Sequence, residues 1–492
     1  MPAGFEALDR RLMHGHPSPE ANLAGWFEFL DAARDLGQPV NWTPEWVPQL
    51  WRYHLHYFDH LTRSGWDPGL AFDWVRANPP GRGTGWEPYP LSRRIPNWIL
   101  SRLRSGASEA WADQSLACQA ESLSRQVEYH LLGNHLLANL RALLFAGCYF
   151  SGPVAGRWLG RALAEWNLQL ERQLLADGGH EERSPMYHAL LLADLVDLIA
   201  LADTYPGVIP AGSVDLWKAQ AARMLGWLLE LLHPDGEIAF FQDAAVGMAP
   251  APKELLTACA SLGVRPQRSA LDRSGYVRLA AGDAMLLADL GVPGPAHQPG
   301  HAHAGALSFE LSRGAQRVLV NSGTSTYEPG AGRDHERSTL AHNTFCDGKK
   351  DQSEMWAAFR VGARARLVAR ERWPDGAEAA IEDAAGVVLC RRFEADRGGY
   401  RIRDVAATEG ARRIDWAFHL HPSVRAVFDS GAWRLRTVGG ETTTLRLDPA
   451  LTSVLQPCFW SPRFGQRIPS LRIHASWQGR GPAEFHHSLV LS

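Results

Sequence analysis

The sequence predicts an α+β protein of two domains, a helical array followed by an antiparallel β-sandwich. Apolar residues recur at three- and four-residue spacing through the first half of the chain, which is typical of helices. From about residue 272 the spacing drops to two, which is typical of strands. The helices precede the strands and do not alternate with them, which argues against one parallel α/β sheet. We expect a helical domain over residues 1–265 and a β-sandwich over residues 266–492.

Five long stretches rich in Leu and Ala predict the helices. They are residues 115–129, 135–150, 156–175, 185–203 and 214–232. Short loops rich in Gly, Pro and Asp separate them, as in residues 176–179 and 233–236. Loops this short predict that neighbouring helices form antiparallel pairs.

Short alternating segments predict the strands of the second domain. They are residues 276–279, 306–311, 317–320, 387–393 and 442–447. Many short strands with turn signals between them are typical of a β-sandwich. We place the boundary between the two domains within residues 260–272.

Composition limits the classes of function. A chain of 492 residues, 45% hydrophobic and 21% charged, has room for at least two apolar cores. A net charge of -3 gives no basic field for nucleic acid, so an anionic partner would have to meet local arginines. No apolar run reaches the roughly 18 residues that predict a membrane span. The six cysteines have no paired spacing, which argues against a disulfide framework or a cysteine zinc site.

The start of the chain leaves the compartment open. Residues 1–16 lack the apolar segment of a secretory signal. Either the protein is intracellular or a signal was removed before this numbering began. The sequence does not fix the oligomeric state.

Two polar clusters lie where helices are predicted to start. Asn is a favoured N-cap, so Asn134 is expected at or just inside a helix start. Ser184 and Pro185 predict a second start, which places Tyr187 and His188 in its first turn. If both starts face one cleft, two positive helix ends would favour a bound carboxylate and a phenolate. Simple capping by Asn134 and packing by Tyr187 are the alternatives.

Three histidines form the other clusters. In a regular strand His301 and His303 would share one face, and Gly305 could mark a bulge that re-aims the first of them. A His-x-His pair with a third ligand can bind zinc, and His342 supplies a candidate third nitrogen. The alternative is a set of core histidines satisfied by hydrogen bonds.

Longer motifs run in order along most of the chain. They include residues 86–90, 94, 97–98, 128–135, 177–180, 182–188, 300–303, 321–324, 337–339, 341–344 and 351–356. Together they resemble the heparinase II/III-like polysaccharide lyases, and most of all the members found with bacterial capsule and exopolysaccharide clusters. The resemblance implies an incomplete (α/α) toroid followed by an antiparallel β-sandwich.

The resemblance also implies a reaction, β-elimination at a uronic acid of an acidic polysaccharide such as a glycosaminoglycan. Asn134 matches the residue that neutralises the substrate carboxylate. Tyr187 matches the catalytic tyrosine, and His301 matches either the opposing base or a second neutralising group. Four further residues are expected to contact or support the substrate, namely His135, Arg94, Arg183 and Glu182.

A structural zinc ion is implied by the same resemblance. His303 and His342 match two of its ligands, and Asn321 stands where the third is usually an aspartate. A neutral amide oxygen is a poorer zinc ligand than a carboxylate, so we expect weaker affinity. Gly305 also stands where relatives often have Asp. The residues that could substitute as third ligand are His335, Asp334 and Asp347.

Two other functions remain open at this level. A glycoside hydrolase on the same fold would need two carboxylates across a cleft, and Glu182 and Asp243 are the pair we would nominate. A polysaccharide-binding or assembly protein without turnover is the second alternative.

Overall fold

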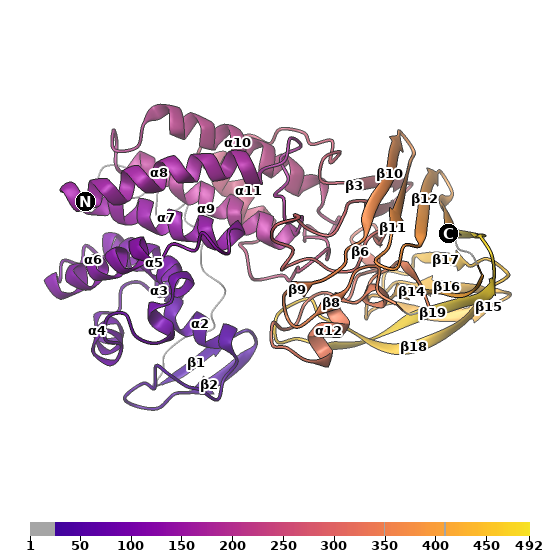
Figure 1. The fold of residues 1–492 in the computed structure, drawn as a ribbon, viewed down its shortest axis with the longest axis horizontal. Coiled ribbons are helices and arrows are strands. Elements are labelled where there is room, and N and C mark those ends of the chain that lie inside the picture. Colours follow the sequence, from indigo (N-terminus) through magenta and orange to yellow (C-terminus); the bar gives the residue numbers. More distant parts are fainter. Residues whose placement is uncertain (1–24, 349, 408–409) are drawn as a thin grey trace. The chain divides into compact units, whose positions relative to one another are not determined.

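A computed structural model describes residues 25–348, 350–407 and 410–492 (Figure 1). The chain divides into two compact units, and several segments alternate between them. The helical unit comprises residues up to 178, 187–226 and 247–268, and the strand unit comprises 179–186, 227–246 and 269–492. Two segments that precede residue 265 therefore belong to the strand unit.

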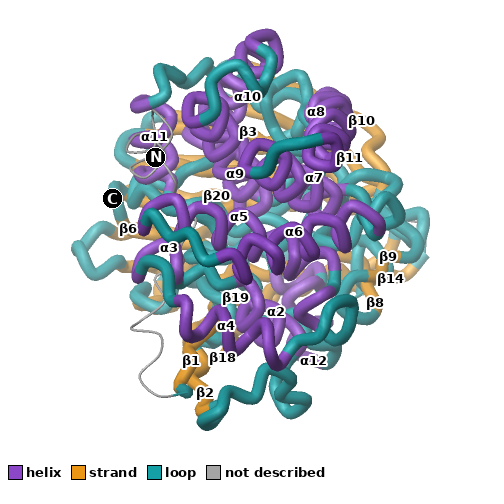
Figure 2. The backbone as a smooth tube through the Cα atoms, turned by 90° about the vertical axis from the view of Figure 1, so that its left-hand side faces the viewer, coloured by secondary structure: helices purple, strands orange, loops and turns teal. Residues whose placement is uncertain are grey.

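The helical unit is an (α/α) toroid built from packed helix pairs, drawn in purple in Figure 2. Helix α5 packs against α2, α6 and α7, and α7 packs against α8. The helices are α2 (Gln49–Tyr57), α3 (Leu61–Ser64), α4 (Pro68–Ala77), α5 (Pro88–Ser105), α6 (Ala110–Arg125), α7 (Gly133–Tyr149), α8 (Pro153–Gln173), α9 (Pro185–Thr204), α10 (Ala211–Glu230) and α11 (Pro252–Ser261). They follow a hairpin of β1 (Trp26–Phe29) and β2 (Ala32–Asp35), and the turn η1 (Thr84–Trp86) precedes α5.

Proline at the first helical position starts many of these helices, because its fixed φ suits a helix and its missing N–H is not needed there. Helix α7 starts differently. Leu132 and Gly133 have φ of 57° and 52°, so the chain turns sharply just before Asn134. Asn134 therefore lies in the first turn of α7, as predicted.

Helix α9 is apolar along most of its length. Among the described residues it is the one helix long and apolar enough to cross a membrane, but 89% of its most apolar stretch is buried. Its Asp194 lies 3.3 Å from Arg141 of α7 and 3.8 Å from Arg93 of α5. Asp197 also pairs with Arg141. A mostly buried helix with paired charges is typical of the core of a globular unit.

Three antiparallel sheets form the strand unit. The largest has the order β10-β11-β12-β13-β20-β17-β16-β15, and the other two have the orders β18-β19-β14-β7 and β3-β4-β5-β6. The strands are β3 (Tyr276–Ala281), β4 (Ala284–Asp289), β5 (Phe309–Arg313), β6 (Gln316–Leu319), β7 (Phe345–Asp347), β10 (Arg366–Trp373), β11 (Gly376–Glu382), β12 (Val388–Asp396), β13 (Gly399–Ala407), β14 (Ala411–His419), β15 (Arg425–Asp429), β16 (Ala432–Arg436), β17 (Thr442–Arg446), β18 (Thr452–Trp460), β19 (Ile468–Arg480) and β20 (Ala483–Leu491). Shorter elements between β6 and β10 are α12 (Ala331–Arg337), η2 (Thr339–Ala341), β8 (Met355–Trp356) and β9 (Arg360–Val361).

The core of the strand unit takes side chains from all three sheets. Phe393 of the largest sheet, Trp416 of β14 and Phe309 of β5 belong to one buried apolar cluster. Residues along β13 alternate between buried and more exposed positions, which is the period of two seen in the sequence. The antiparallel sandwich follows from this alternation.

The predicted elements are largely confirmed. The five predicted helices correspond to α6 through α10, and four of the five predicted strands overlap β3, β6, β12 and β17 along most of their length. The possible strand placement of His301 and His303 is wrong. Their backbone lies in a loop, and β5 begins only at Phe309.

The buried histidines predict acid sensitivity. Burial lowers the pKa of His56 to about 3, of His60 to about 4 and of His419 to about 3. The unfolded chain takes up these protons below about pH 6.5 and the folded chain does not, so acid favours unfolding. As the pH falls from 6.5 to 4, each of these three histidines should lower the free energy of unfolding by up to about 3 kcal/mol.

Denaturant unfolding measured from pH 7 to pH 4 tests this expectation. His56→Gln should flatten the pH dependence, because a glutamine oxygen can still accept the 2.9 Å hydrogen bond from Trp74 Nε1. His130→Gln, at an exposed position, is the matched control and should leave the slope unchanged. An unaltered slope in His56→Gln would contradict the assignment.

Candidate active site

His301 is held by a buried carboxylate within the strand unit. Its Nδ1 lies within hydrogen-bond distance of Glu182 Oε2. The Glu182 side chain is 2% exposed, whereas the His301 side chain is 14% exposed. A carboxylate at Nδ1 fixes the tautomer, so Nε2 carries the lone pair that can accept a proton. This is the pairing that orients a histidine for acid–base chemistry.

The segment around Glu182 is itself anchored. Arg183 has φ of 59°, and its guanidinium donates to the carbonyl of Val292. Tyr276 Oη donates to the carbonyl of Arg183 over 2.5 Å. Both Glu182 and Arg183 were predicted as substrate contacts. In the structure Glu182 positions His301, and Arg183 fixes the segment that carries Glu182.

Tyr187 and Asn134 both begin helices of the helical unit. Tyr187 lies in the first turn of α9, directly after the segment that holds Glu182, and is 7% exposed. The pyrrolidine of Pro185 starts this helix, as predicted, and Ser184 Oγ donates to the carbonyl of Asp243. Asn134 lies in the first turn of α7.

A second histidine–carboxylate pair lies beside Asn134. His135 Nδ1 is 3.2 Å from Glu128 Oε1, and the rings of His135 and Tyr89 are 4.6 Å apart. Asn139 holds Glu128 in place, since its Nδ2 donates to Glu128 Oε2 over 3.0 Å and its Oδ1 accepts from the Glu128 backbone N–H over 2.8 Å. Burial raises the pKa of Tyr89 to about 12, so this phenol stays protonated. The predicted supporting role of His135 is consistent with this position.

Arg94 does not have the predicted role. Its side chain is fully buried and lies over the ring of Trp74. Its guanidinium donates to Gln119 Oε1 and to the carbonyls of His56 and Gly85, over 2.9, 3.0 and 2.7 Å. Because every face is occupied by the protein, Arg94 braces the helices and does not contact substrate.

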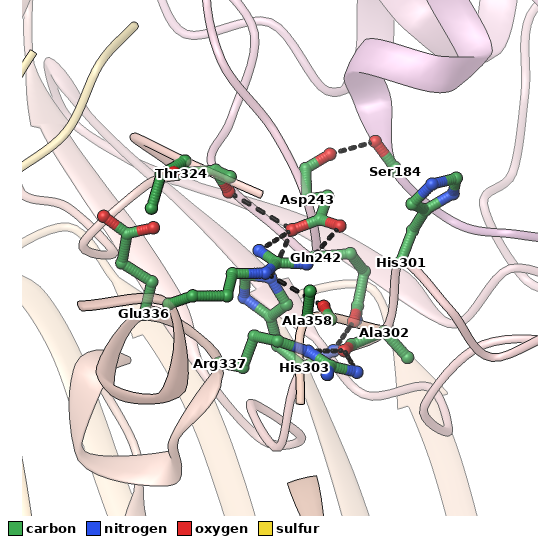
Figure 3. Close-up of polar contacts among 12 residues, drawn as sticks. Ser184, Gln242, Asp243, His301, Ala302, His303, Thr324, Glu336, Arg337 and Ala358 are labelled. Atoms are coloured by element: carbon green, nitrogen blue, oxygen red, sulfur yellow. Dashed lines mark hydrogen bonds and ion pairs between the residues drawn. The ribbon is translucent and has the colours of Figure 1, made fainter. Parts of the chain in front are cut away.

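Asp243 is the centre of a buried polar network in the strand unit (Figure 3). Both of its oxygens accept from the Arg333 guanidinium, and its Oδ1 lies 2.8 Å from His303 Nε2. Burial by itself would raise the pKa of Asp243, but the Arg333 charge and His303 outweigh it and hold that pKa well below its ordinary value. Asp243 is therefore an anion shared by two partners.

His301 and His303 serve different partners, although one residue separates them. Figure 3 shows their rings turned to different sides. The backbone around them is bonded to other loops, with Asp243 N–H donating to the His301 carbonyl and His303 N–H donating to Gln242 Oε1. These loop contacts replace a strand ladder, which is why the predicted shared face does not form.

His303 and His342 face each other over 3.1 Å through Nδ1 and Nε2. The other nitrogen of each ring lies beside an obligate acceptor, Asp243 for His303 and the carbonyl of Ser338 for His342. Burial lowers the pKa of His303 to about 4 and that of His342 well below its usual value. Two neutral rings with these tautomers point lone pair at lone pair, as two ligands of one metal ion do.

Asn321 does not complete a ligand set in this geometry. Its Nδ2 donates to the Phe240 carbonyl over 3.1 Å, and its Oδ1 accepts from Asn343 N–H over 3.0 Å. Among the described residues, no three His, Cys, Asp or Glu side chains form a metal-binding group. The pair of histidines fits a metal, whereas the amide of Asn321 does not, so we derive no reaction step through zinc.

Gly305 is required by His342. A Cβ at position 305 would lie 2.8 Å from His342 Cδ2. Carbon atoms do not approach this closely, so any side chain at 305 would displace the imidazole. The absence of an aspartate here follows from this close approach, and Gly305 does not form the bulge that was considered for a strand.

Residues 71–262 match the family described as heparinase II/III N-terminus, and residues 263–488 match heparinase II/III-like, C-terminal. The chain belongs to the heparinase II/III-like family. The resemblance inferred from the motifs is thereby confirmed.

Two curated relatives have modest identity to this heparinase II/III-like chain. FtsZ-localized protein C of Caulobacter vibrioides is 26% identical over 396 residues, which cover 73% of this chain and 66% of that protein. A heparin-sulfate lyase of Pedobacter heparinus is 27% identical over 193 residues, which cover 31% and 27%. The chain thus spans less than two thirds of the length of either relative.

Solved structures show the fold of the family. Heparinase III aligns with a TM-score of 0.74 at 16% identity, over 99% of this chain and 85% of that one. A heparan sulfate lyase of Pedobacter heparinus aligns with a TM-score of 0.64 at 18% identity, over 100% and 83%. These similarities confirm an (α/α) toroid with a β-sandwich.

The sequence analysis noted Arg337 only as part of the motif over residues 337–339, and it did not note Arg333. Arg333 and Arg337 are both fully buried, which is rare for arginine. The nomination of Asp243 as a hydrolase carboxylate is also corrected, because a buried anion bonded to Arg333 and His303 cannot exchange protons with substrate.

Arg333→Leu should lower the free energy of unfolding by about 3–5 kcal/mol, because it leaves the buried Asp243 charge without its main partner. Chemical denaturation measures this loss. Adding Asp243→Asn to Arg333→Leu should recover part of it. Arg403→Leu removes exposed ion pairs with Glu484 and Glu378 and should cost much less than Arg333→Leu. Equal losses in the two single variants would contradict the argument.

Proposed function

We propose that this protein is a polysaccharide lyase that cleaves an acidic, uronate-containing polymer by β-elimination. The observation that carries the proposal is the buried Glu182 carboxylate bonded to Nδ1 of the partly exposed His301. Membership of the heparinase II/III-like family supports it. Asn134 and Tyr187, each in the first turn of a helix, supply the other two groups that the chemistry needs.

β-Elimination must first make a weakly acidic C–H bond reactive. The C5 proton of a uronate is only weakly acidic, because its removal adds negative charge to a carboxylate that is already negative. A donor on that carboxylate lowers this cost as an oxyanion hole does. The Asn134 side-chain amide at the N-terminus of α7 is suited to this task, since both the amide and the helix end favour negative charge.

The elimination then balances in protons and bonds. A base takes the C5 proton, the electron pair forms the C4–C5 double bond, and the C4–O4 bond breaks. An acid returns a proton to O4 of the leaving chain. We assign the acid role to Tyr187, because a phenol carries an O–H that can donate a proton. His301, through Nε2, serves as base or as a second neutralising group, according to the epimer of the uronate.

A second candidate function is a polysaccharide-binding or assembly protein without turnover. It is favoured by the relative from Caulobacter vibrioides, which is named for localisation with FtsZ and not for a reaction. The absence of an acidic ligand at position 321 also favours it. The two functions differ in whether the bound polymer is broken.

Ultraviolet absorbance separates these functions. Incubation with a panel of uronate polysaccharides should give rising absorbance, because elimination leaves a double bond conjugated with the carboxylate. Tyr187→Phe should reduce the rate by at least about a hundredfold, the usual contribution of general acid–base catalysis. His301→Ala should also lose most activity.

Reducing ends are assayed in the same reactions. New reducing ends without absorbance would contradict a lyase and indicate hydrolysis. Binding without either signal would favour the second function. Phe428→Ala, an exposed aromatic on the distant edge strand β15, is the control and should leave the rate unchanged.

We also propose that zinc, where bound, is held by His303 and His342 and only weakly. Each ring presents one nitrogen to the other and keeps its second nitrogen on an acceptor, which is the usual support of a metal-bound histidine. A zinc ion there would brace the loops that carry these two histidines. The amide at Asn321 cannot supply a carboxylate ligand.

Asn321→Asp should raise the zinc retained per chain after dialysis, and zinc should raise the Tm of this variant more than that of the wild type. The reason is that a carboxylate is a stronger zinc ligand than an amide whose oxygen is already bonded to Asn343 N–H. Adding His342→Gln to the variant should abolish the gain. Stoichiometric zinc in the dialysed wild type would contradict the expectation.

A further inference from the structure

A short exposed hairpin lies beside His301 in the strand unit. Strands β8 and β9 pair Met355 with Val361 and Trp356 with Arg360. Trp356 is 53% exposed and Phe359 is 42% exposed. Ala357 has φ of 49°, a conformation that a residue with a side chain adopts only at some cost. Two-residue strands do not hold a hairpin by themselves, so this one needs outside support.

Buried arginines supply that support. Arg337 Nη1 donates to the carbonyls of Ala357 and Arg360 over 3.0 and 3.2 Å. Arg333 Nε donates to the carbonyl of Ala358 over 3.0 Å. These are the arginines of the network in Figure 3, where Arg337 also donates to the carbonyl of Ala302. The hairpin is therefore tied to the residue that separates His301 from His303.

The side chains on the hairpin have the chemistry of a site for an anionic sugar. The Arg360 guanidinium lies 5.1 Å from the centre of the Trp356 ring. No described carboxylate forms an ion pair with Arg360, and the nearby Glu354 accepts from Ala363 N–H over 3.0 Å. A flat aromatic face stacks on the apolar face of a sugar ring, and a guanidinium pairs with a carboxylate or sulfate.

Phe359 links this surface to the candidate base. Its ring centre lies 6.1 Å from that of His301, edge to face, and 5.0 Å from that of Tyr327. Tyr327 in turn stacks with His301 over 6.2 Å. Aromatic contacts thus lead from the imidazole to Phe359, which lies in the turn of the hairpin that carries Trp356.

We propose that Trp356, Phe359 and Arg360 form an aromatic platform that binds a sugar unit of the polymer next to the one that reacts at His301. Trp356 stacks on the ring of that unit, and Arg360 binds its anionic group, either a carboxylate or a sulfate. This proposal rests on the proposed function, because it takes the polymer to pass His301. It adds a subsite that selects acidic polymers.

Binding and turnover are measured on the full chain with Trp356→Ala, Arg360→Gln and two matched controls. The controls are Phe428→Ala and Arg425→Gln, both exposed residues of β15. Binding is measured in the Tyr187→Phe background by titration with heparan sulfate, unsulfated hyaluronan and neutral dextran. Turnover is measured by ultraviolet absorbance, and the Tm of every variant is checked.

Trp356→Ala should weaken binding about tenfold and raise KM with kcat nearly unchanged, as expected for a contact made equally before and during reaction. Arg360→Gln should weaken binding about three- to tenfold and reduce its salt dependence. A loss with heparan sulfate alone assigns Arg360 to sulfate, and a loss with both acidic polymers assigns it to the carboxylate. Dextran should not bind, and the controls should match wild type.

The outcomes separate the platform from the lyase. If Trp356→Ala still produces the absorbance of the elimination product and its KM equals that of the wild type, the platform proposal is overturned and the lyase proposal stands. If Trp356→Ala and Arg360→Gln weaken binding but no protein produces absorbance, the platform proposal stands and the lyase proposal is overturned. Three other results would overturn the platform proposal. They are binding losses equal to those of the control variants, tight binding of dextran, and no binding of any acidic polymer.

Discussion

The buried ion pair between Asp243 and Arg333 holds together the parts of the strand unit that carry chemistry. Asp243 comes from a segment that follows α10, whereas Arg333 lies in α12, ninety positions later. Between them the pair also fixes His303 and the hairpin carbonyl of Ala358. Removing two charges from water is costly, and the cost is offset only because each atom has a defined partner. Such a network tolerates few rearrangements, which suits residues that must keep a fixed geometry.

The His301–Glu182 pair of the strand unit and the His135–Glu128 pair of the helical unit have different surroundings. In the strand unit the carboxylate of Glu182 is buried and His301 remains accessible. In the helical unit Glu128 is held by Asn139, and His135 lies against Tyr89 beside Asn134. In both of these pairs the carboxylate is less exposed than the imidazole.

Periodicity and motif order were enough to predict the fold and the helix starts near Asn134 and at Pro185. They failed where a side chain's partner lies far away in the sequence. The resemblance implied that Arg94 supports the substrate, yet acceptors from α6, α2 and the turn η1 enclose its guanidinium. The loop at His301 reads as a strand because its backbone partners, Gln242 and Asp243, come from another segment.

The alternation of segments between the two units restricts how such a chain can evolve. Glu182 and Asp243 are encoded before residue 265, and their partners His301 and His303 are encoded after it. Recombination between relatives at that point would separate each histidine from its carboxylate unless both parents carried matching pairs. We therefore expect the helical and sandwich halves to be inherited together, and new specificities to arise by substitution on exposed loops more readily than by exchange of domains.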